Sequence, residues 1–172
     1  MSILNEIVAE ARQNLERVSP LQFDLFVERL CSRRRVFVAG AGRTGLIAAA
    51  FATRLAQLGW TVFAVGEPTT PAVRAGDLLL ACTGSGETPA VCRQIETAQS
   101  LGAEALCVTG NAESRAAKLA ASVLEIPAAP SKQLGRSSFE QALLLVLDGL
   151  ASTAAQKAGI DPSAVWSNHA NL

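Results

Sequence analysis

Five short apolar runs alternate along the chain with stretches of helical periodicity, and this alternation restricts the possible folds more than any other feature. The runs lie at residues 36–39, 60–65, 78–82, 105–108 and 123–126. Continuous apolar strands separated by helices are typical of a parallel sheet that helices cover on both faces. The pattern therefore predicts an α/β protein: a three-layer αβα sandwich with a five-stranded parallel sheet, flavodoxin- or Rossmann-like.

Helical periodicity also appears before the first apolar run and after the last one. We expect one domain over residues 1–172, with N-terminal helices within 1–34, the sheet core at 35–127 and a long helix at 137–158. The tail at 160–172 is polar and lacks the periodicity of an element that packs on its own domain. We expect this tail to be irregular.

Composition excludes several classes of partner. The 172 residues include 15 Lys plus Arg and 15 Asp plus Glu, so there is no excess of positive charge for nucleic acid. No apolar run reaches the ~18 residues that span a bilayer, and the charges within residues 1–17 exclude a signal peptide. We therefore expect a cytoplasmic protein that binds neither nucleic acid nor membrane.

The cysteines and the single histidine do not form a metal-binding pattern. Cys31, Cys82, Cys92 and Cys107 lack the spacing of a zinc site. They are expected to be small buried apolar residues in a reducing compartment. The sequence predicts neither a metal nor a cofactor.

The first apolar run leads into a glycine-rich loop, Gly40-Ala41-Gly42-Arg43-Thr44-Gly45. This loop matches the dinucleotide-binding pattern GxGxxG, and Glu67 lies near the end of the next strand, where such folds place a ribose-binding acid. Taken alone, the loop would favour NAD binding. The main argument against NAD binding is that the sequence shows no second domain to hold the substrate with which NAD would react.

A second loop, Thr83-Gly84-Ser85-Gly86-Glu87-Thr88, follows the third apolar run. Its glycines let backbone N–H groups turn toward an anion, its hydroxyls add donors, and Pro89 begins a helix whose positive end faces the loop. The alternative is a capped helix with Ser85 as N-cap and no ligand. The density of small and hydroxyl residues favours a phosphate monoester.

Together the two loops resemble those of SIS (sugar isomerase) domains, which have G-x-G-R-[S/T]-G after the first strand and [S/T]-G-S-G-x-T after the third. Further segments make nearly the whole chain similar to the 6-phospho-3-hexuloisomerase group of that family. They are Arg54-Leu55-Ala56-Gln57-Leu58-Gly59, Gly66-Glu67-Pro68-Thr69-Thr70-Pro71, Gly76-Asp77-Leu78-Leu79, Phe139-Glu140-Gln141 and His169-Ala170-Asn171-Leu172. Thr44 and Thr83 stand where relatives often have Ser, which keeps the hydroxyl.

The resemblance implies a sugar-phosphate isomerase of the aldose/ketose type that interconverts D-arabino-hex-3-ulose 6-phosphate and D-fructose 6-phosphate. The family reaction passes through a cis-enediol and serves formaldehyde fixation in the ribulose monophosphate pathway. The resemblance makes Glu140 the base, whereas Ser137-x-x-Glu140 is also a capping box, and spacing alone does not decide between them. A regulatory SIS module that senses a sugar phosphate is the other possibility, although no DNA-binding helix accompanies the chain.

His169, the only histidine, is the fourth residue from the C-terminal end. A histidine in a tail is usually only solvated, but the resemblance makes it an acid/base or hydroxyl-orienting group donated to a neighbouring subunit. That implies a homo-oligomer, with a dimer of dimers expected and Trp166 as a possible anchor. Arg43 stabilises the enediolate, holds phosphate, or is a surface arginine at a helix start.

The expected substrate-binding residues belong to the two loops. They are Gly42, Arg43, Thr44, Thr83, Gly84, Ser85, Gly86, Glu87 and Thr88.

Overall fold

The computed structural model describes residues 2–127, 130–161 and 163–171. Two helices precede the sheet, α1 (Ile3–Leu15) and α2 (Pro20–Cys31). The strands are β1 (Arg35–Ala39), β2 (Thr61–Ala64), β3 (Leu78–Thr83), β4 (Glu104–Thr109) and β5 (Ser122–Glu125). The other helices are α3 (Gly42–Gln57), α4 (Pro89–Ser100), α5 (Arg115–Leu119), α6 (Ser137–Lys157) and α7 (Ala164–Ser167).

The five strands form one parallel sheet in the order β2-β1-β3-β4-β5. The predicted fold class is therefore confirmed. From β1 the chain first moves outward to β2 and then returns to the other side of β1 with β3, so the strand order reverses between β1 and β3. This reversal positions the candidate site.

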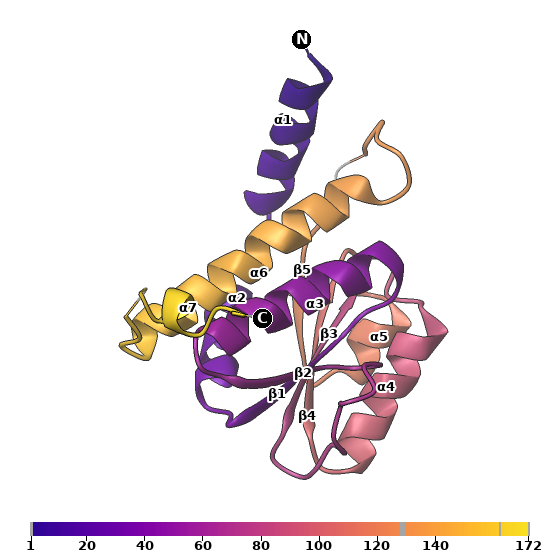
Figure 1. Cartoon of the computed structure of the whole chain (residues 1–172). Helices are drawn as coiled ribbons and strands as arrows, with labels where there is room; N and C mark the ends of the chain where they lie inside the picture. The colour runs from indigo at the N-terminus through magenta and orange to yellow at the C-terminus, as the bar shows by residue number, and fades with distance from the viewer. Residues whose placement is uncertain (1, 128–129, 162, 172) are drawn as a thin grey trace.

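Successive residues of the strands face opposite layers, and each layer has its own apolar core. One core packs strand residues such as Val38 and Leu80 against α2, α3 and α6. The other packs Phe37 and Leu79 against α4 and α5. Figure 1 shows these two helical layers on either side of the sheet, with α1 projecting from the body beside the first part of α6.

Three of the four cysteines lie in these cores, as expected. Cys82, Cys92 and Cys107 are buried, and burial raises the pKa of the Cys107 thiol to about 12. Such thiols are inert packing groups at neutral pH. For Cys31 the prediction is wrong: it is the last residue of α2 and is exposed.

The expectation of an irregular tail is wrong in part. Residues Ala164–Ser167 form the short helix α7, and Val165 and Ile160 pack against the core of the same chain. The side-chain amide of Asn168 donates to the carbonyl oxygen of Gln57 at 3.0 Å. A single helical turn contains too few residues to show periodicity, which is why the pattern did not reveal it.

Candidate functional site

The two glycine-rich loops lie side by side because they follow the neighbouring strands β1 and β3. Both leave the carboxyl edge of the sheet, at the point where the strand order reverses. In open α/β sheets this crevice is where ligands bind. The topology therefore brings together the two segments that the sequence singled out.

In the first loop, two glycines allow strand and helix to touch. A Cβ on Gly40 would lie 2.9 Å from Cα of Gly45, and a Cβ on Gly45 would lie 2.9 Å from the carbonyl oxygen of Gly40. Gly42 begins α3 with a positive φ of 58° and has open space where a Cβ would be. These contacts give Gly40 and Gly45 a packing role that requires no dinucleotide.

The second loop is held in shape by its own hydroxyl groups. The Oγ1 of Thr83 accepts the backbone N–H of Gly86 at 3.2 Å and lies 3.1 Å from Oγ1 of Thr88. The Oγ of Ser85 accepts the N–H of Glu87 at 3.2 Å. Thr83 is buried, so its hydroxyl stabilises the loop from the interior of the protein. Ser85 and Thr88 are partly exposed.

The alternative of Ser85 as a helix cap is wrong. The N-cap of α4 is Thr88, and no side-chain hydrogen bond caps this helix. The carboxylate of Glu87 accepts the backbone N–H of Arg115 at the start of α5, at 2.9 Å. The Glu87 side chain therefore connects the loop to the start of α5, whereas no side chain caps the first turn of α4.

Glu140 lies in the first turn of α6, and its carboxylate does not form a capping box. The N-cap of α6 is Arg136, with no side-chain cap, and the hydroxyl of Ser137 donates instead to the carbonyl oxygen of Leu134 at 2.7 Å. The Oε2 of Glu140 accepts from Nε–H of Arg43 at 2.6 Å. Glu140 is 8% exposed, whereas the Arg43 side chain is 70% exposed.

The ion pair joins the start of α3 to the start of α6, and both helices begin at the crevice. Thr44, next to Arg43, is buried. Of the guanidinium donors of Arg43, only Nε–H has a hydrogen-bond partner within the described part of the chain. Its other guanidinium donors are therefore available to a ligand.

A buried polar contact from α1 holds the first turn of α6. The side-chain amide of Asn14, which is fully buried, donates to Oγ of Ser138 at 2.7 Å and to its carbonyl oxygen at 3.3 Å. The adjoining loop is tied to α1 as well, since Glu10 accepts from Ser131 and from Gln133. Helix α1 thus helps to set the position of Glu140.

His169 is not brought to Glu140 within the chain. It follows α7, which packs near the C-terminal end of α3, while Arg43 and Glu140 lie near its N-terminal end. The 16 residues of α3 correspond to about 24 Å. His169 is exposed, and its ring stacks on that of Trp166, which is also exposed.

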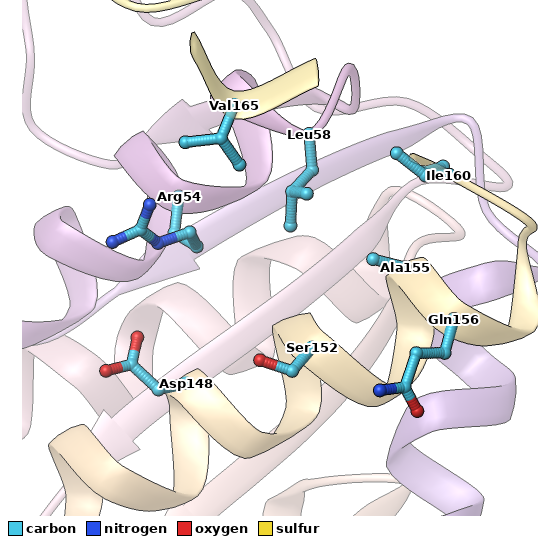
Figure 2. Close-up of a pocket in the computed structure, with 8 residues that line it drawn as sticks. All are labelled: Arg54, Leu58, Asp148, Ser152, Ala155, Gln156, Ile160 and Val165. Carbon is cyan, nitrogen blue, oxygen red and sulfur yellow. The ribbon is translucent and has the colours of Figure 1, made fainter. Parts of the chain in front are cut away.

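A separate cavity of about 430 Å³ lies between α3 and α6, away from the two loops. Figure 2 shows Arg54 of α3 and Asp148 of α6 facing each other across it, with Val165 of the tail above. None of the residues expected at the site lines this cavity. Among the described residues, no group of His, Cys, Asp or Glu is arranged to hold a metal ion, and no helix has the length and apolar character to cross a bilayer.

Sequence reasoning missed Arg136 and the contact between Asn14 and Ser138. Arg136 donates from Nη1 to the carbonyl oxygen of Gly84 at 3.3 Å. Its place just before the helix that carries Glu140 was the available signal. The contact of Asn14 joins residues 124 positions apart, and no local pattern reports it.

Comparison with known proteins fits this architecture. The family model described as "SIS domain" matches residues 29–150, which include both loops and the ion pair. The chain belongs to the SIS domain family. This confirms the resemblance inferred from the loops.

Two relatives of this SIS domain chain are similar over nearly its whole length. A protein of Mycobacterium gastri named 3-hexulose-6-phosphate isomerase is 38% identical, covering 100% of this chain and 89% of the relative. One of the same name from Bacillus subtilis is 34% identical, covering 97% and 95%. A crystal structure from Methanococcus jannaschii, whose report infers that same function, has a TM-score of 0.89 at 26% identity, covering 97% and 99%.

Proposed function

We propose that the chain is a 6-phospho-3-hexuloisomerase, which interconverts D-arabino-hex-3-ulose 6-phosphate and D-fructose 6-phosphate. The observation that carries this proposal is the buried carboxylate of Glu140, paired with Arg43 beside the glycine-rich loops. An isomerase of this kind needs a base next to an anion site, and both occur at one crevice. The full-length similarity to proteins named for this reaction supports the same substrate.

The second loop binds the substrate's phosphate in this proposal. Ser85 and Thr88 are partly exposed and carry hydroxyl donors, and the uncapped first turn of α4 directs its positive end toward the loop. Gly84 and Gly86 let the backbone approach the phosphate. Thr83 and Glu87 act indirectly, since their side chains hold backbone N–H groups of the loop and of α5.

Glu140 moves the proton in this mechanism. In the direction of fructose 6-phosphate, its carboxylate removes the proton from C2, beside the C3 ketone, and a 2,3-enediol forms. Return of the proton to C3 gives the C2 ketone. The free guanidinium donors of Arg43 can stabilise the negative charge on the enediolate oxygens as it develops. Gly42 and Thr44, on either side of Arg43, complete this side of the site.

His169 enters the site from a neighbouring subunit in this proposal, and the protein is a homo-oligomer. Within its own chain the tail lies near the far end of α3, a helix about 24 Å long whose first turn carries Arg43 of the ion pair. Helix α1 exposes Ile3, Leu4 and Val8, and α3 exposes Leu46. Exposed apolar side chains of this kind are typical of surfaces that a second copy covers. A dimer of dimers would satisfy both observations.

The imidazole of His169 of the partner subunit would transfer a proton between O2 and O3 of the enediol. A 3-ketohexose 6-phosphate cannot close a stable ring, because O6 is esterified and O5 would form a four-membered ring. Ring opening is therefore needed only for fructose 6-phosphate. We assign the shuttle role to His169 for this reason.

The experiment is incubation of the pure protein with fructose 6-phosphate, followed by ¹³C NMR. We expect a second carbonyl resonance from a phosphorylated 3-ketose, and none with unphosphorylated fructose. Binding of fructose 6-phosphate without any conversion would instead indicate a sugar-phosphate sensor and overturn the proposal.

A further inference from the structure

Three arginines border the candidate site, and they differ in their charge partners. Arg43 pairs with Glu140. Arg115, at the start of α5, pairs with Glu96 at 2.9 Å. Within the described part of the chain, Arg136 forms no ion pair, and its one side-chain hydrogen bond goes to the carbonyl oxygen of Gly84. Arg136 is therefore the cation of this group whose charge no carboxylate neutralises.

The backbone of the second loop makes room for this arginine. A Cβ on Gly84 would lie 3.1 Å from Cδ of Arg136 and 3.0 Å from Cδ1 of Phe139. The stem of Arg136 therefore rests against Gly84 at a distance that leaves little space for any other residue there. Arg136 is also the N-cap residue of α6, so its backbone is fixed at the end of a helix of 21 residues.

The charge of the second loop itself is unfavourable for phosphate. Its one ionisable residue is Glu87, which is negative, and the carbonyl oxygen of Gly84 adds a further partial negative charge. A phosphate monoester carries about −1.5 to −2 charges at pH 7. Hydroxyls and backbone N–H groups supply dipoles to such a group but no counter-charge. The guanidinium of Arg136 covers the Gly84 carbonyl and provides one.

We propose that Arg136 is the residue that neutralises the substrate's phosphate and makes the site select phosphorylated over unphosphorylated ketoses. The inference rests on the proposed function, because it assigns the phosphate to the second loop. The role of Arg136 is in substrate binding, because its guanidinium acts on the phosphate, which is remote from the carbons between which the proton moves. Removing it should raise KM and leave kcat nearly unchanged.

The test compares Arg136→Gln with Arg34→Gln, which removes the same charge just before β1, at the opposite edge of the sheet. For Arg136→Gln we expect KM for fructose 6-phosphate to rise about 10- to 100-fold, the size of a lost charge-assisted hydrogen bond. The inhibition constant of inorganic phosphate should rise by a similar factor, because phosphate carries the same charged group. Added NaCl should raise KM less steeply in Arg136→Gln than in the wild type. Arg34→Gln should match the wild type in all three measurements.

The inference is overturned if KM and the phosphate inhibition constant of Arg136→Gln stay within twofold of the values for Arg34→Gln. A fall in kcat at constant KM would also overturn it, because the arginine would then act on the chemical step. Calorimetric titration with inorganic phosphate distinguishes failure of this inference from failure of the proposed function, because it measures anion binding without turnover. A wild type that binds phosphate through Arg136 but converts no fructose 6-phosphate would refute the isomerase and retain the anion site.

Discussion

The Nε–H of Arg43 donates to Oε2 of Glu140 at 2.6 Å, joining the first turns of two helices that begin 95 residues apart (Ser137 minus Gly42). The carboxylate is buried and the guanidinium is mostly exposed. A buried carboxylate at a ligand crevice can serve as a general base for a substrate bound there.

Replacement of Glu140 by Gln should remove the base and keep the fold. We expect kcat to fall by about 10²–10⁴-fold, the range for a lost general base, with an unchanged circular dichroism spectrum. The matched control is Glu67→Gln, since Glu67 is exposed and belongs to the alternative dinucleotide pattern. A normal kcat in Glu140→Gln would make Glu140 structural, and a loss of activity in Glu67→Gln would reopen the dinucleotide interpretation.

Replacement of Asn14 by Ala should destabilise the protein by about 1–3 kcal/mol, because it leaves buried polar groups of Ser138 without their partner. The free energy of unfolding from urea titration is the measurement. Gln13→Ala, one position earlier on the exposed side of α1, should change it by less than about 0.5 kcal/mol. Equal effects in the two variants would show that the contact between α1 and α6 contributes little.

Replacement of Gly86 by Ala should abolish phosphosugar binding. Gly86 has φ 70°, and an added Cβ would lie 1.9 Å from Oγ of Ser114, so the loop must move. Gly159→Ala is the control, because Gly159 has φ 66° and open space around it. It should cost only the backbone strain of about 1–2 kcal/mol. Calorimetry with fructose 6-phosphate is the measurement, and normal binding by Gly86→Ala would exclude the second loop as the phosphate site.

Mixing two inactive variants tests whether the site is shared between subunits. Glu140→Gln and His169→Ala should each be nearly inactive alone. Co-refolded in equal amounts, random dimers should recover about one quarter of the wild-type activity, because half are mixed and each of these has one intact site. No recovery, with mixed oligomers verified by native mass spectrometry, would place His169 outside the partner's site.

Much of the fold could be predicted because the physical signals are local. Apolar runs such as residues 78–82 are read directly as buried strands, and Pro20 and Pro89 mark the starts of α2 and α4. The strand order was not available from these signals, since it depends on which distant strands pair. It emerges only in the structure, and it explains why both loops reach one crevice.

The two loops and Glu140, which meet at one crevice, could be named from the sequence, but their contacts could not. Ser137-x-x-Glu140 has the pattern of a capping box, yet α6 begins at Ser137 with Arg136 as its N-cap, and the Glu140 carboxylate pairs with Arg43. That partner is 97 residues away in the sequence. Spacing along the helix therefore left a capping role for Glu140 open, and the tertiary structure excludes it.

The central claim is that proton transfer occurs between C2 and C3, with Glu140 as the base. It is tested most directly by incubating the protein with fructose 6-phosphate in D₂O and locating deuterium in the recovered sugar by NMR. The wild type should place deuterium at C3 and not at C1, and Glu140→Gln should exchange neither position. Exchange at C1 would indicate a 1,2-enediol and an aldose product, which would contradict the proposed reaction, and exchange at C3 by Glu140→Gln would contradict the assigned base.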